Sequence, residues 1–418
     1  MNAAGVLETL ARLRAAGEEM RCRPAARTLD SLCEVLDAWS DPDGTWQKRL
    51  GESLPAATGF HPETVRAGLA AGLAPYRGAA LRRLVARELG GSDALDRGQI
   101  SGFDATAVVL AGAIPMPSLV SAIAPLALRS PVLLKPASAD PVSAALVARS
   151  LAEADPALGA SVAVVDLSRD DGEALDALLQ ADCVVVNGSD VAIAELAARL
   201  PPARRWVPYG HRFSVALVGP GAARGEELAG AAAGLARDIA SWDQLGCLSP
   251  IAIYATADAD SIAEAVAEAL ESMEARWPRG AVDPATAAQI AEERAEAEMR
   301  AAAGQPVRVI APRLGTGWTV VREADATPRP APLHRFVRVH PCNGPGEALE
   351  ALRPAKHQLA AVALAGFGAE SNALAQALAR LGASRVCAAG QLQTPPLDWP
   401  RENRGVLLPL ARRCDIEP

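Results

Sequence analysis

Residues 243–250 read Asp-Gln-Leu-Gly-Cys-Leu-Ser-Pro, which places Cys247 between a predicted helix and a predicted strand. The apolar stripe within residues 228–239 predicts the helix, and the apolar run 251–254 predicts the strand. We expect Cys247 on a tight loop, where free backbone N–H groups stabilise a thiolate and a developing oxyanion, as thioester-forming catalysis requires. The alternative is a small buried hydrophobic residue, the commonest role of an intracellular cysteine. Cys247 is therefore a candidate nucleophile.

Short apolar runs on both sides of this loop alternate with stretches of helical period. The first series of predicted strands is 107–110, 132–134, 162–165 and 183–186, with helices at 141–154 and 191–200. The second series is 215–218, 251–254, 307–310 and 359–364. Alternating strands and helices indicate parallel sheets, so the sequence predicts an α/β fold with a doubly wound sheet and a second α/β domain.

Two further regions have the period of helices. Apolar residues recur at helical spacing through residues 1–98, which predicts a helical lead-in to the first sheet. Residues 285–303 carry closely spaced acidic and basic side chains. This mixture indicates a helix with a solvated face that contributes no chemistry.

Polar residues follow two strands of the first series. Lys135 ends the run 132–134, and a cation at the carboxyl edge of a parallel sheet reaches a ribose or a phosphate. The alternative is a solvated lysine at the end of a strand. Gly188 and Ser189 follow the run 183–186 at the start of a helix, where the backbone N–H groups accept a pyrophosphate. An ordinary helix cap by Ser189 or Asp190 explains this pattern equally well.

The composition excludes several classes of protein. The 418 residues are 50% hydrophobic with a net charge of −8, and seven Trp, three Tyr and five Phe provide few stacking platforms, so nucleic acid is not an expected partner. Seven cysteines without a Cys-x-x-Cys pair indicate a reduced, cytoplasmic protein without structural zinc. The amino terminus lacks the pattern of a signal peptide. The uncharged segment 105–128 contains one Gly and three Pro, so we expect a buried strand, loop and helix rather than a membrane span.

The order of these motifs resembles the aldehyde dehydrogenase superfamily. Strand-Lys-Pro, strand-Asn-Gly-Ser and Asp-Gln-Leu-Gly-Cys-Leu-Ser-Pro occur in that order over nearly the whole chain. Within the superfamily the chain resembles the acyl-CoA reductases typified by the bacterial luminescence fatty acid reductase (LuxC type). Further segments carry this resemblance: Leu-Pro-Ala-Ala-Thr-Gly-Phe at 54–60, Ile-Pro-Met-Pro-Ser at 114–118 and Gly-Gln-Leu-Gln-Thr-Pro-Pro-Leu-Asp-Trp-Pro at 390–400.

The resemblance implies a role for each candidate residue. It makes Cys247 the nucleophile, Lys135 a contact of the adenosine ribose, and Gly188 with Ser189 the pyrophosphate contact. NAD-preferring relatives often carry a glutamate at the position of Ser138, so NADPH is the expected cofactor. The corresponding domains are a helical segment 1–98, a dinucleotide-binding domain 99–213, a catalytic domain 214–390 and a carboxy-terminal segment 391–418 that packs back across the domains.

The expected reaction is reduction of a fatty acyl-CoA or acyl-protein thioester to the fatty aldehyde. Hydrolytic relatives have a glutamate base where this chain reads Pro-Tyr-Gly-His-Arg at 208–212, and its absence protects an acyl-enzyme from water. The resemblance also implies a homo-oligomer and an acyl-transferring synthetase as partner. Two departures from the family pattern occur, at Ala113 and at residues 401–403. The alternatives are a CoA-acylating dehydrogenase of a small aldehyde and a catalytically silent cofactor-binding subunit.

Overall fold

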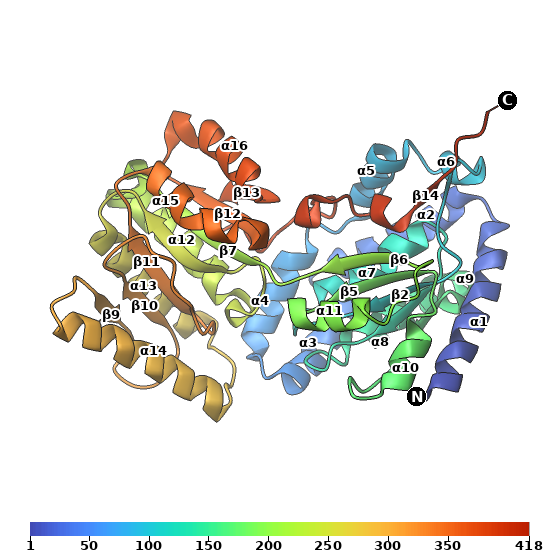
Figure 1. Cartoon of the computed structure of the whole chain (residues 1–418), viewed down its shortest axis with the longest axis horizontal. Coiled ribbons are helices and arrows are strands. Elements are labelled where there is room, and N and C mark those ends of the chain that lie inside the picture. The colour runs from blue at the N-terminus through green and yellow to red at the C-terminus, as the bar shows by residue number, and fades with distance from the viewer. Residues whose placement is uncertain (418) are drawn as a thin grey trace. The chain divides into compact units, whose positions relative to one another are not determined.

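In the computed structural model, which describes residues 1–417, the chain forms two units that each contain a largely parallel sheet (Figure 1). The first unit comprises residues 1–58, 72–211 and 396–418, and the second comprises residues 59–71 and 212–395. The predicted fold class, an α/β protein with a helical lead-in, is confirmed. The four-part division into 1–98, 99–213, 214–390 and 391–418 stays a prediction.

The sheet of the first unit has five parallel strands in the order β4-β3-β2-β5-β6. Its main strands are β2 (Thr106–Val109), β3 (Val132–Lys135), β4 (Val162–Val164), β5 (Cys183–Asn187) and β6 (Arg205–Tyr209). The first four were predicted, because strands buried on both faces are continuous apolar runs. Strand β6 was not predicted, since Pro208 and two charged or polar residues interrupt an edge strand.

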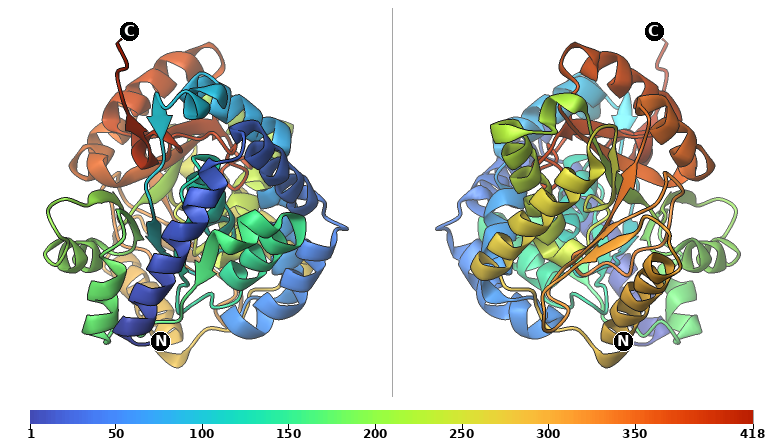
Figure 2. Two further views of the ribbon diagram at one scale, coloured as in Figure 1. Left: turned by 90° about the vertical axis from the view of Figure 1, so that its right-hand side faces the viewer. Right: turned by 90° about the vertical axis from the view of Figure 1, so that its left-hand side faces the viewer.

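Helices cover both faces of this sheet. Alternate strand residues, among them Ala107, Leu133 and Val184, face the apolar stripe of α1 and the helix α10, and the left panel of Figure 2 shows α1 in dark blue. Helices α7 and α8 contact β3 and β4 respectively. The helices of the unit are α1 (Ala3–Arg21), α2 (Ala25–Ser40), α3 (Thr45–Thr58), α5 (Gly78–Leu89), α6 (Asp93–Asp96), α7 (Met116–Ala127), α8 (Ser143–Ala154), α9 (Pro156–Ala160), α10 (Gly172–Leu178) and α11 (Asp190–Ala197). Helix α4 (Pro62–Leu73) belongs to the second unit except for its last two residues.

The uncharged segment 105–128 has the predicted structure. It forms β2, a loop and α7, with Pro115 just before the helix and Pro125 in its last turn. In the described residues 1–417, no helix has the length and hydrophobicity of a membrane span. The chain ends with a short strand, β14 (Arg412–Arg413), which pairs with β1 (Ile100–Ser101) of the same unit.

The second unit contains a seven-stranded sheet in the order β13-β12-β7-β8-β11-β10-β9, in which only β9 is antiparallel to its neighbour. The strands are β7 (Phe213–Val218), β8 (Pro250–Ala255), β9 (Arg308–Ile310), β10 (Thr319–Arg322), β11 (Phe336–Pro341), β12 (Leu359–Ala365) and β13 (Arg385–Ala388). The helices are α12 (Gly225–Ala240), α13 (Ala259–Arg276), α14 (Pro284–Ala302), α15 (Pro345–Leu352) and α16 (Ser371–Leu381). Strands β7, β8, β9 and β12 were predicted.

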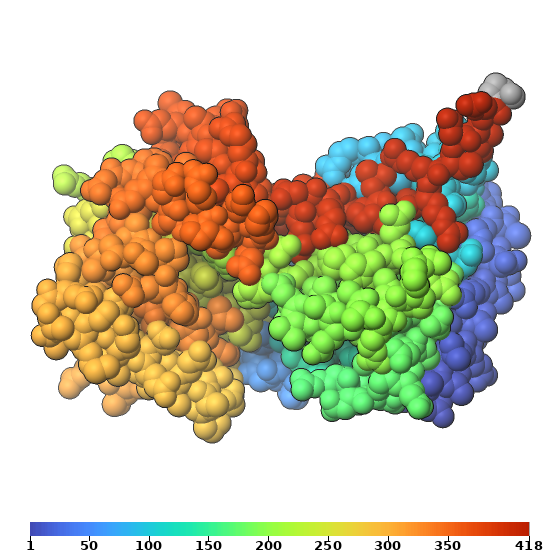
Figure 3. Space-filling model, in the orientation of Figure 1, coloured from blue at the N-terminus to red at the C-terminus, as the bar shows by residue number. Residues whose placement is uncertain are grey.

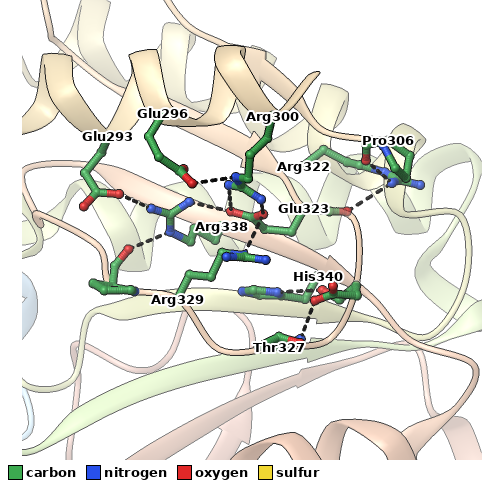
Figure 4. A network of polar contacts seen from close by, with 12 residues as sticks. Glu293, Glu296, Arg300, Pro306, Arg322, Glu323, Thr327, Arg329, Arg338 and His340 are labelled. Carbon is green, nitrogen blue, oxygen red and sulfur yellow. Dashed lines mark hydrogen bonds and ion pairs between the residues drawn. The ribbon is translucent and has the colours of Figure 1, made fainter. Parts of the chain in front are cut away.

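Ion pairs hold helix α14 against this sheet. Glu323 follows β10 and is fully buried, and the guanidinium groups of Arg300, Arg329 and Arg338 point toward its carboxylate (Figure 4). Arg300 Nη1 lies 2.7 Å and Arg329 Nε 3.2 Å from Glu323 Oε2, and Arg338 also pairs with Glu293 of α14. We call these five residues the arginine cluster. The helix was predicted correctly, but its charges are not only solvated, because they balance buried charges of the sheet.

Candidate functional site

Cys247 lies in a tight turn of the second unit, as the sequence predicts. The turn joins α12 and the short helix 241–244 to β8, and it is closed by the Ser249 N–H, which donates to Gly246 O at 2.9 Å. The Cys247 side chain is exposed, whereas Leu248 and Ser249 are buried. An exposed sulfur on a turn between two buried segments is accessible to a substrate and is not a core residue.

The backbone before Cys247 adopts a strained conformation. Trp242, Asp243 and Gln244 have φ angles of 52°, 50° and 65°, so three consecutive residues other than glycine lie in the left-handed region. Each such residue costs about 1–3 kcal/mol and persists only where its surroundings impose it. A second run of this kind, residues 333–335, has φ angles of 65°, 55° and 66°. Side chains join the two runs.

Asp243 and Gln244 make these connections. Arg335 Nη2 donates to Asp243 Oδ1 at 2.6 Å, and the other carboxylate oxygen accepts the Gly280 N–H at 2.9 Å. The amide of Gln244 accepts the Phe336 N–H at 2.8 Å and donates to Phe336 O and Pro250 O, both at 2.9 Å. All three side chains that form the links are buried. The Asp-Gln pair of the motif therefore fixes the strained segment that leads into the cysteine turn.

Ser214 of β7 holds the cysteine itself. Its Oγ donates to Cys247 O at 2.7 Å and accepts the Ala361 N–H of β12 at 3.2 Å. The cysteine backbone is thus tied to the two neighbouring strands. Sequence analysis did not find Ser214, because an isolated serine at the start of a strand has no distinctive signal.

The carboxyl edge of the first sheet brings the other predicted residues together. The chain runs from β2 outward to β3 and β4, and then to β5 on the other side of β2, so strand order reverses between β2 and β5. Ligands of open α/β sheets bind at such a reversal. Asn187, the last residue of β5, bridges this point by donating from Nδ2 to Val109 O at 3.0 Å. Gly188 and Ser189 follow immediately, and Lys135 ends β3.

Lys135 is 8% exposed, and the hydrogen bond that its ammonium donates, to Pro136 O, is long at 3.5 Å. Within residues 1–417, no carboxylate lies within 4.0 Å of its Nζ. Burial lowers the pKa of Lys135, while the charge of Asp166, which follows β4, opposes that shift. A buried ammonium with unused donors is suited to an anionic or hydroxyl-bearing ligand. Asp166 was not identified from the sequence.

Ser138, Gly188 and Ser189 lie in the loops of the same edge. Ser138 is exposed in the turn 137–140, which is closed by Asp140 N–H donating to Ala137 O at 3.1 Å. Ser189 caps α11, since its Oγ accepts the Ala192 N–H at 3.2 Å. A Cβ on Gly188 would make an ordinary contact of 3.6 Å with Ala192, so the protein's own packing does not require glycine there.

A residue of the carboxy-terminal segment also reaches this edge. Arg401 Nη1 donates to Asn187 Oδ1 at 2.8 Å, and its guanidinium stacks over the Tyr209 ring at 4.4 Å. Arg404 anchors the segment by donating to Pro208 O at 2.7 Å. Figure 3 shows this segment in red against the green surface around β6 and α11. The departure from the family pattern at Arg401 therefore places a cation beside Gly188, and Ala113 lies in the loop after β2.

The predicted residues thus fall into two sets. Lys135, Ser138, Gly188 and Ser189 share one edge of the first unit, and Cys247 lies in the second unit. The first set offers an ammonium, a serine-capped helix terminus and space at a glycine. The second offers an exposed thiol on a fixed turn.

Comparison with known proteins identifies the family and the fold of the chain. A family model described as acyl-CoA reductase (LuxC) matches residues 23–400. Similar solved structures include aldehyde dehydrogenase 21 from Physcomitrella patens in complex with succinate, with 13% identity, 99% of this chain and 90% of that chain covered and a TM-score of 0.75. The NAD-dependent benzaldehyde dehydrogenase from Corynebacterium glutamicum has 15% identity and a TM-score of 0.71, with 99% of this chain and 89% of that chain covered. The NADP-dependent glyceraldehyde-3-phosphate dehydrogenase from Bacillus halodurans C-125 complexed with NADP has 14% identity and a TM-score of 0.73, with 99% of this chain and 90% of that chain covered.

At such identities the solved structures establish the fold alone, and they confirm the predicted aldehyde dehydrogenase-like architecture. No curated protein sequence gives a significant match.

Proposed function

The chain belongs to the acyl-CoA reductase (LuxC) family, and from this premise we propose that it reduces a fatty acyl thioester to the aldehyde through an acyl-enzyme on Cys247, with NADPH as reductant. The observation that carries the proposal is the exposed sulfur on the fixed turn 246–249. A nucleophile must be accessible and must keep its position while a bond forms. The strained run 242–244 and Ser214 meet the second condition.

In the proposed reaction the Cys247 thiolate attacks the thioester carbonyl carbon. The bond from that carbon to the CoA sulfur then breaks, CoA leaves as a thiolate that takes up a proton, and the acyl group is bound to Cys247 Sγ. A nicotinamide dinucleotide, held by the residues at the edge of the first sheet, would supply the hydride for this acyl carbon. The aldehyde is released when the carbon–Sγ bond breaks and the thiolate is restored. Residues 208–212 contain no glutamate, so the carboxylate that activates water in hydrolytic relatives is missing there.

The residues at the edge of the first sheet fit a nicotinamide dinucleotide. Lys135 has donors for a ribose hydroxyl, and the α11 terminus with Ser189 suits a pyrophosphate. The room at Gly188 permits close approach of a phosphate to the backbone. Arg401, 2.8 Å from Asn187 Oδ1, adds positive charge at the same place. Ser138 brings no negative charge toward a 2′-phosphate, which supports NADPH, whereas the Asp166 carboxylate opposes it.

The test is NADPH oxidation by the full chain with acyl-CoAs of graded length, run beside Cys247→Ala. We expect turnover with a chain-length optimum in the wild type and an acyl adduct on Cys247 by intact mass. A wild type no faster than Cys247→Ala refutes the proposal. Turnover only in the direction from a small aldehyde to acyl-CoA would indicate a CoA-acylating dehydrogenase, and dinucleotide binding without turnover would indicate a silent subunit.

The choice of cofactor and the partners are tested separately. Ser138→Glu adds a carboxylate that competes with a 2′-phosphate, so we expect the ratio of kcat/KM for NADPH over NADH to fall by at least tenfold, about 1.4 kcal/mol. An unchanged ratio would remove Ser138 from the cofactor site. Family membership also suggests self-association and an acyl-donating synthetase, which sedimentation of the chain alone and with that enzyme would test.

A further inference from the structure

A turn in the second unit, residues 390–394, is held by a buried carboxylate. Asp238 lies on α12 with no solvent exposure. Its Oδ2 accepts the Gly390 N–H at 2.7 Å, and its Oδ1 accepts the Leu392 N–H at 3.0 Å. Both carboxylate oxygens are therefore used by backbone amides of one turn.

Arg385 of β13 holds the same turn by its carbonyl groups. Its Nη1 donates to Leu392 O at 2.6 Å, and its Nη2 donates to Thr394 O at 3.2 Å. Leu392 is thus bound through its N–H by Asp238 and through its C=O by Arg385. The helix and the turn also approach closely, because a Cβ on Gly234 would lie 2.9 Å from the Ala389 backbone. The position of the turn is fixed from both sides.

The turn is connected to the cysteine turn by one side chain. Gln393 Nε2 donates to Asp238 O at 3.1 Å and to Ser249 Oγ at 3.0 Å. Ser249 is 1% exposed, and its N–H closes the turn at Gly246 that carries Cys247. The Asp238 carboxylate is therefore linked to the cysteine turn through the Leu392 N–H, the next residue Gln393 and the hydrogen bond from Gln393 to Ser249.

We propose that Asp238 is a positioning residue for Cys247: its ionised carboxylate orders the turn 390–394, and Gln393 transmits that order through Ser249 to the cysteine turn. The inference rests on the proposed function, because Cys247 is taken as the reacting group. An ionised Asp238 satisfies two N–H donors. A protonated one presents an O–H to a donor, so one amide of the turn loses its acceptor.

The surroundings of Asp238 make this change accessible near neutral pH. Burial raises the pKa of Asp238 to about 7, although the amides of Gly390 and Leu392 and the charge of Arg385 oppose the rise. The other ionisable groups nearby are Arg237 on the same helix, beside Gly390, and Cys387 on β13, whose own pKa is raised by burial to about 11. A guanidinium keeps its proton in proteins, and the raised pKa keeps the Cys387 thiol neutral between pH 5.5 and 9, so Asp238 is the group of this cluster that changes charge there.

The test is the rate of Cys247 alkylation by iodoacetamide from pH 5.5 to 9, measured by peptide mass spectrometry on the full chain. We expect two ionisations in the wild type, that of Cys247 itself and one near pH 7 from Asp238. Asp238→Asn should remove the ionisation near pH 7 and lower the maximal alkylation rate at high pH by about tenfold. This factor is the equivalent of one hydrogen bond to a charged group. Gln393→Leu should have the same effect, and the double variant should be no slower than either single variant.

Asp155→Asn is the matched control. Asp155 is a buried carboxylate of the first unit, and its partner Arg23 holds its pKa down to about 2. In Asp155→Asn, the pH dependence of the Cys247 alkylation rate should still show both ionisations. The inference is overturned if Asp238→Asn keeps the ionisation near pH 7, or if the two single effects add, as independent structural defects would. If Asp238→Asn does not fold, the wild type and Gln393→Leu decide the matter. Alkylation needs no acyl-CoA, so failure of the proposed reduction is seen separately.

Discussion

Two carboxylates of the second unit, Asp238 and Glu323, are equally buried and behave in opposite ways. Both side chains are 0% exposed. Asp238 is met by backbone amides, and burial raises its pKa to about 7. Burial also raises the pKa of Glu323, but the hydrogen bond from Arg300 and the charge of Arg338 outweigh it and the net shift is downward. Backbone amides and the charge of one arginine, Arg385, leave the pKa of Asp238 raised, whereas the arginines that bind the Glu323 carboxylate lower its pKa.

This difference separates a region for chemistry from a region for stability. The segment 238–250 and the turn 390–394 are joined by amide hydrogen bonds to Asp238 and Ser249, so we expect their geometry to respond to protonation of the Asp238 carboxylate. The arginine cluster ties α14 to the sheet by ion pairs, which hold the pKa of Glu323 below its usual value. Substitutions in the first region should therefore change the reaction, and substitutions in the second should change stability. The following predictions test that separation.

The largest expected effect is on the reaction. Cys247→Ala removes the nucleophile, so acyl-CoA reduction should fall by at least about a thousandfold. The melting temperature should stay within about 1 °C, because the side chain is exposed. The matched control is Cys414→Ala, another exposed cysteine, which should change neither quantity. A loss of stability in Cys247→Ala would show that the two regions are not separate.

The next effect is on stability alone. Glu323→Gln leaves the buried Arg338 and the half-buried Arg300 and Arg329 without their shared carboxylate, and the free energy of unfolding should fall by about 3–5 kcal/mol. Urea denaturation measures it, with Glu298→Gln on the exposed face of α14 as a control expected within about 0.5 kcal/mol. The kcat of the remaining folded enzyme should be unchanged. An equal loss in both variants would contradict the role assigned to the cluster.

A substitution of Gln244 should lower both the stability and the kcat, each by an intermediate amount. Gln244→Met keeps the size of the side chain but removes the hydrogen bonds of its amide to Phe336 N–H, Phe336 O and Pro250 O. We expect a loss of about 1–3 kcal/mol in stability and about a tenfold loss in kcat, because the strained run 242–244 relaxes. Gln391→Met, on the exposed side of the turn 390–394, is the control. A change in stability without a change in kcat would show that this run supports only the fold.

The sequence predicts much of the fold, and strand β11 shows one physical reason for the exceptions. Runs such as 183–186 are apolar throughout, since their strands are covered on both faces. Strand β11 was missed because Arg338 and His340 are buried in it, and the partners of Arg338 come from α14 and from Glu323. A strand that contains a charged residue can be predicted as buried only when the ion-pair partner of that residue is known. Such partners are distant in the sequence.

The same reasoning applies to the site. Cys247, Lys135 and Ser189 lie within motifs with a local pattern, so they were found as candidates. Asp238 was missed although a local signal exists, because it lies on the same apolar stripe as Leu235 and Ile239, and a lone acid within such a stripe is a buried acid. Ser214 has no such signal, since its role depends on which strands are neighbours.

The smallest expected effect is the pH dependence of stability, which has opposite sign for the two acids. Asp238 ionises near pH 3.8 when unfolded and near 7 when folded, so the folded chain holds more protons in between and stability falls as pH rises through this window. Glu323 has a lowered pKa, so its contribution is complete above its unfolded pKa of 4.5 and is lost as pH falls through the lower folded value.

Calorimetry of the wild type, Asp238→Asn and Glu323→Gln from pH 3 to 8 separates these contributions, each of which is at most about 1.4 kcal/mol per pH unit. Relative to the wild type, Asp238→Asn should become more stable as pH rises from 4 to 7, because it lacks the acid whose ionisation is costly. Glu323→Gln should instead recover relative to the wild type only as pH falls below 4.5. If both variants follow the same slope, amide and guanidinium partners are equivalent for a buried carboxylate in this protein, and the separation of the two regions fails.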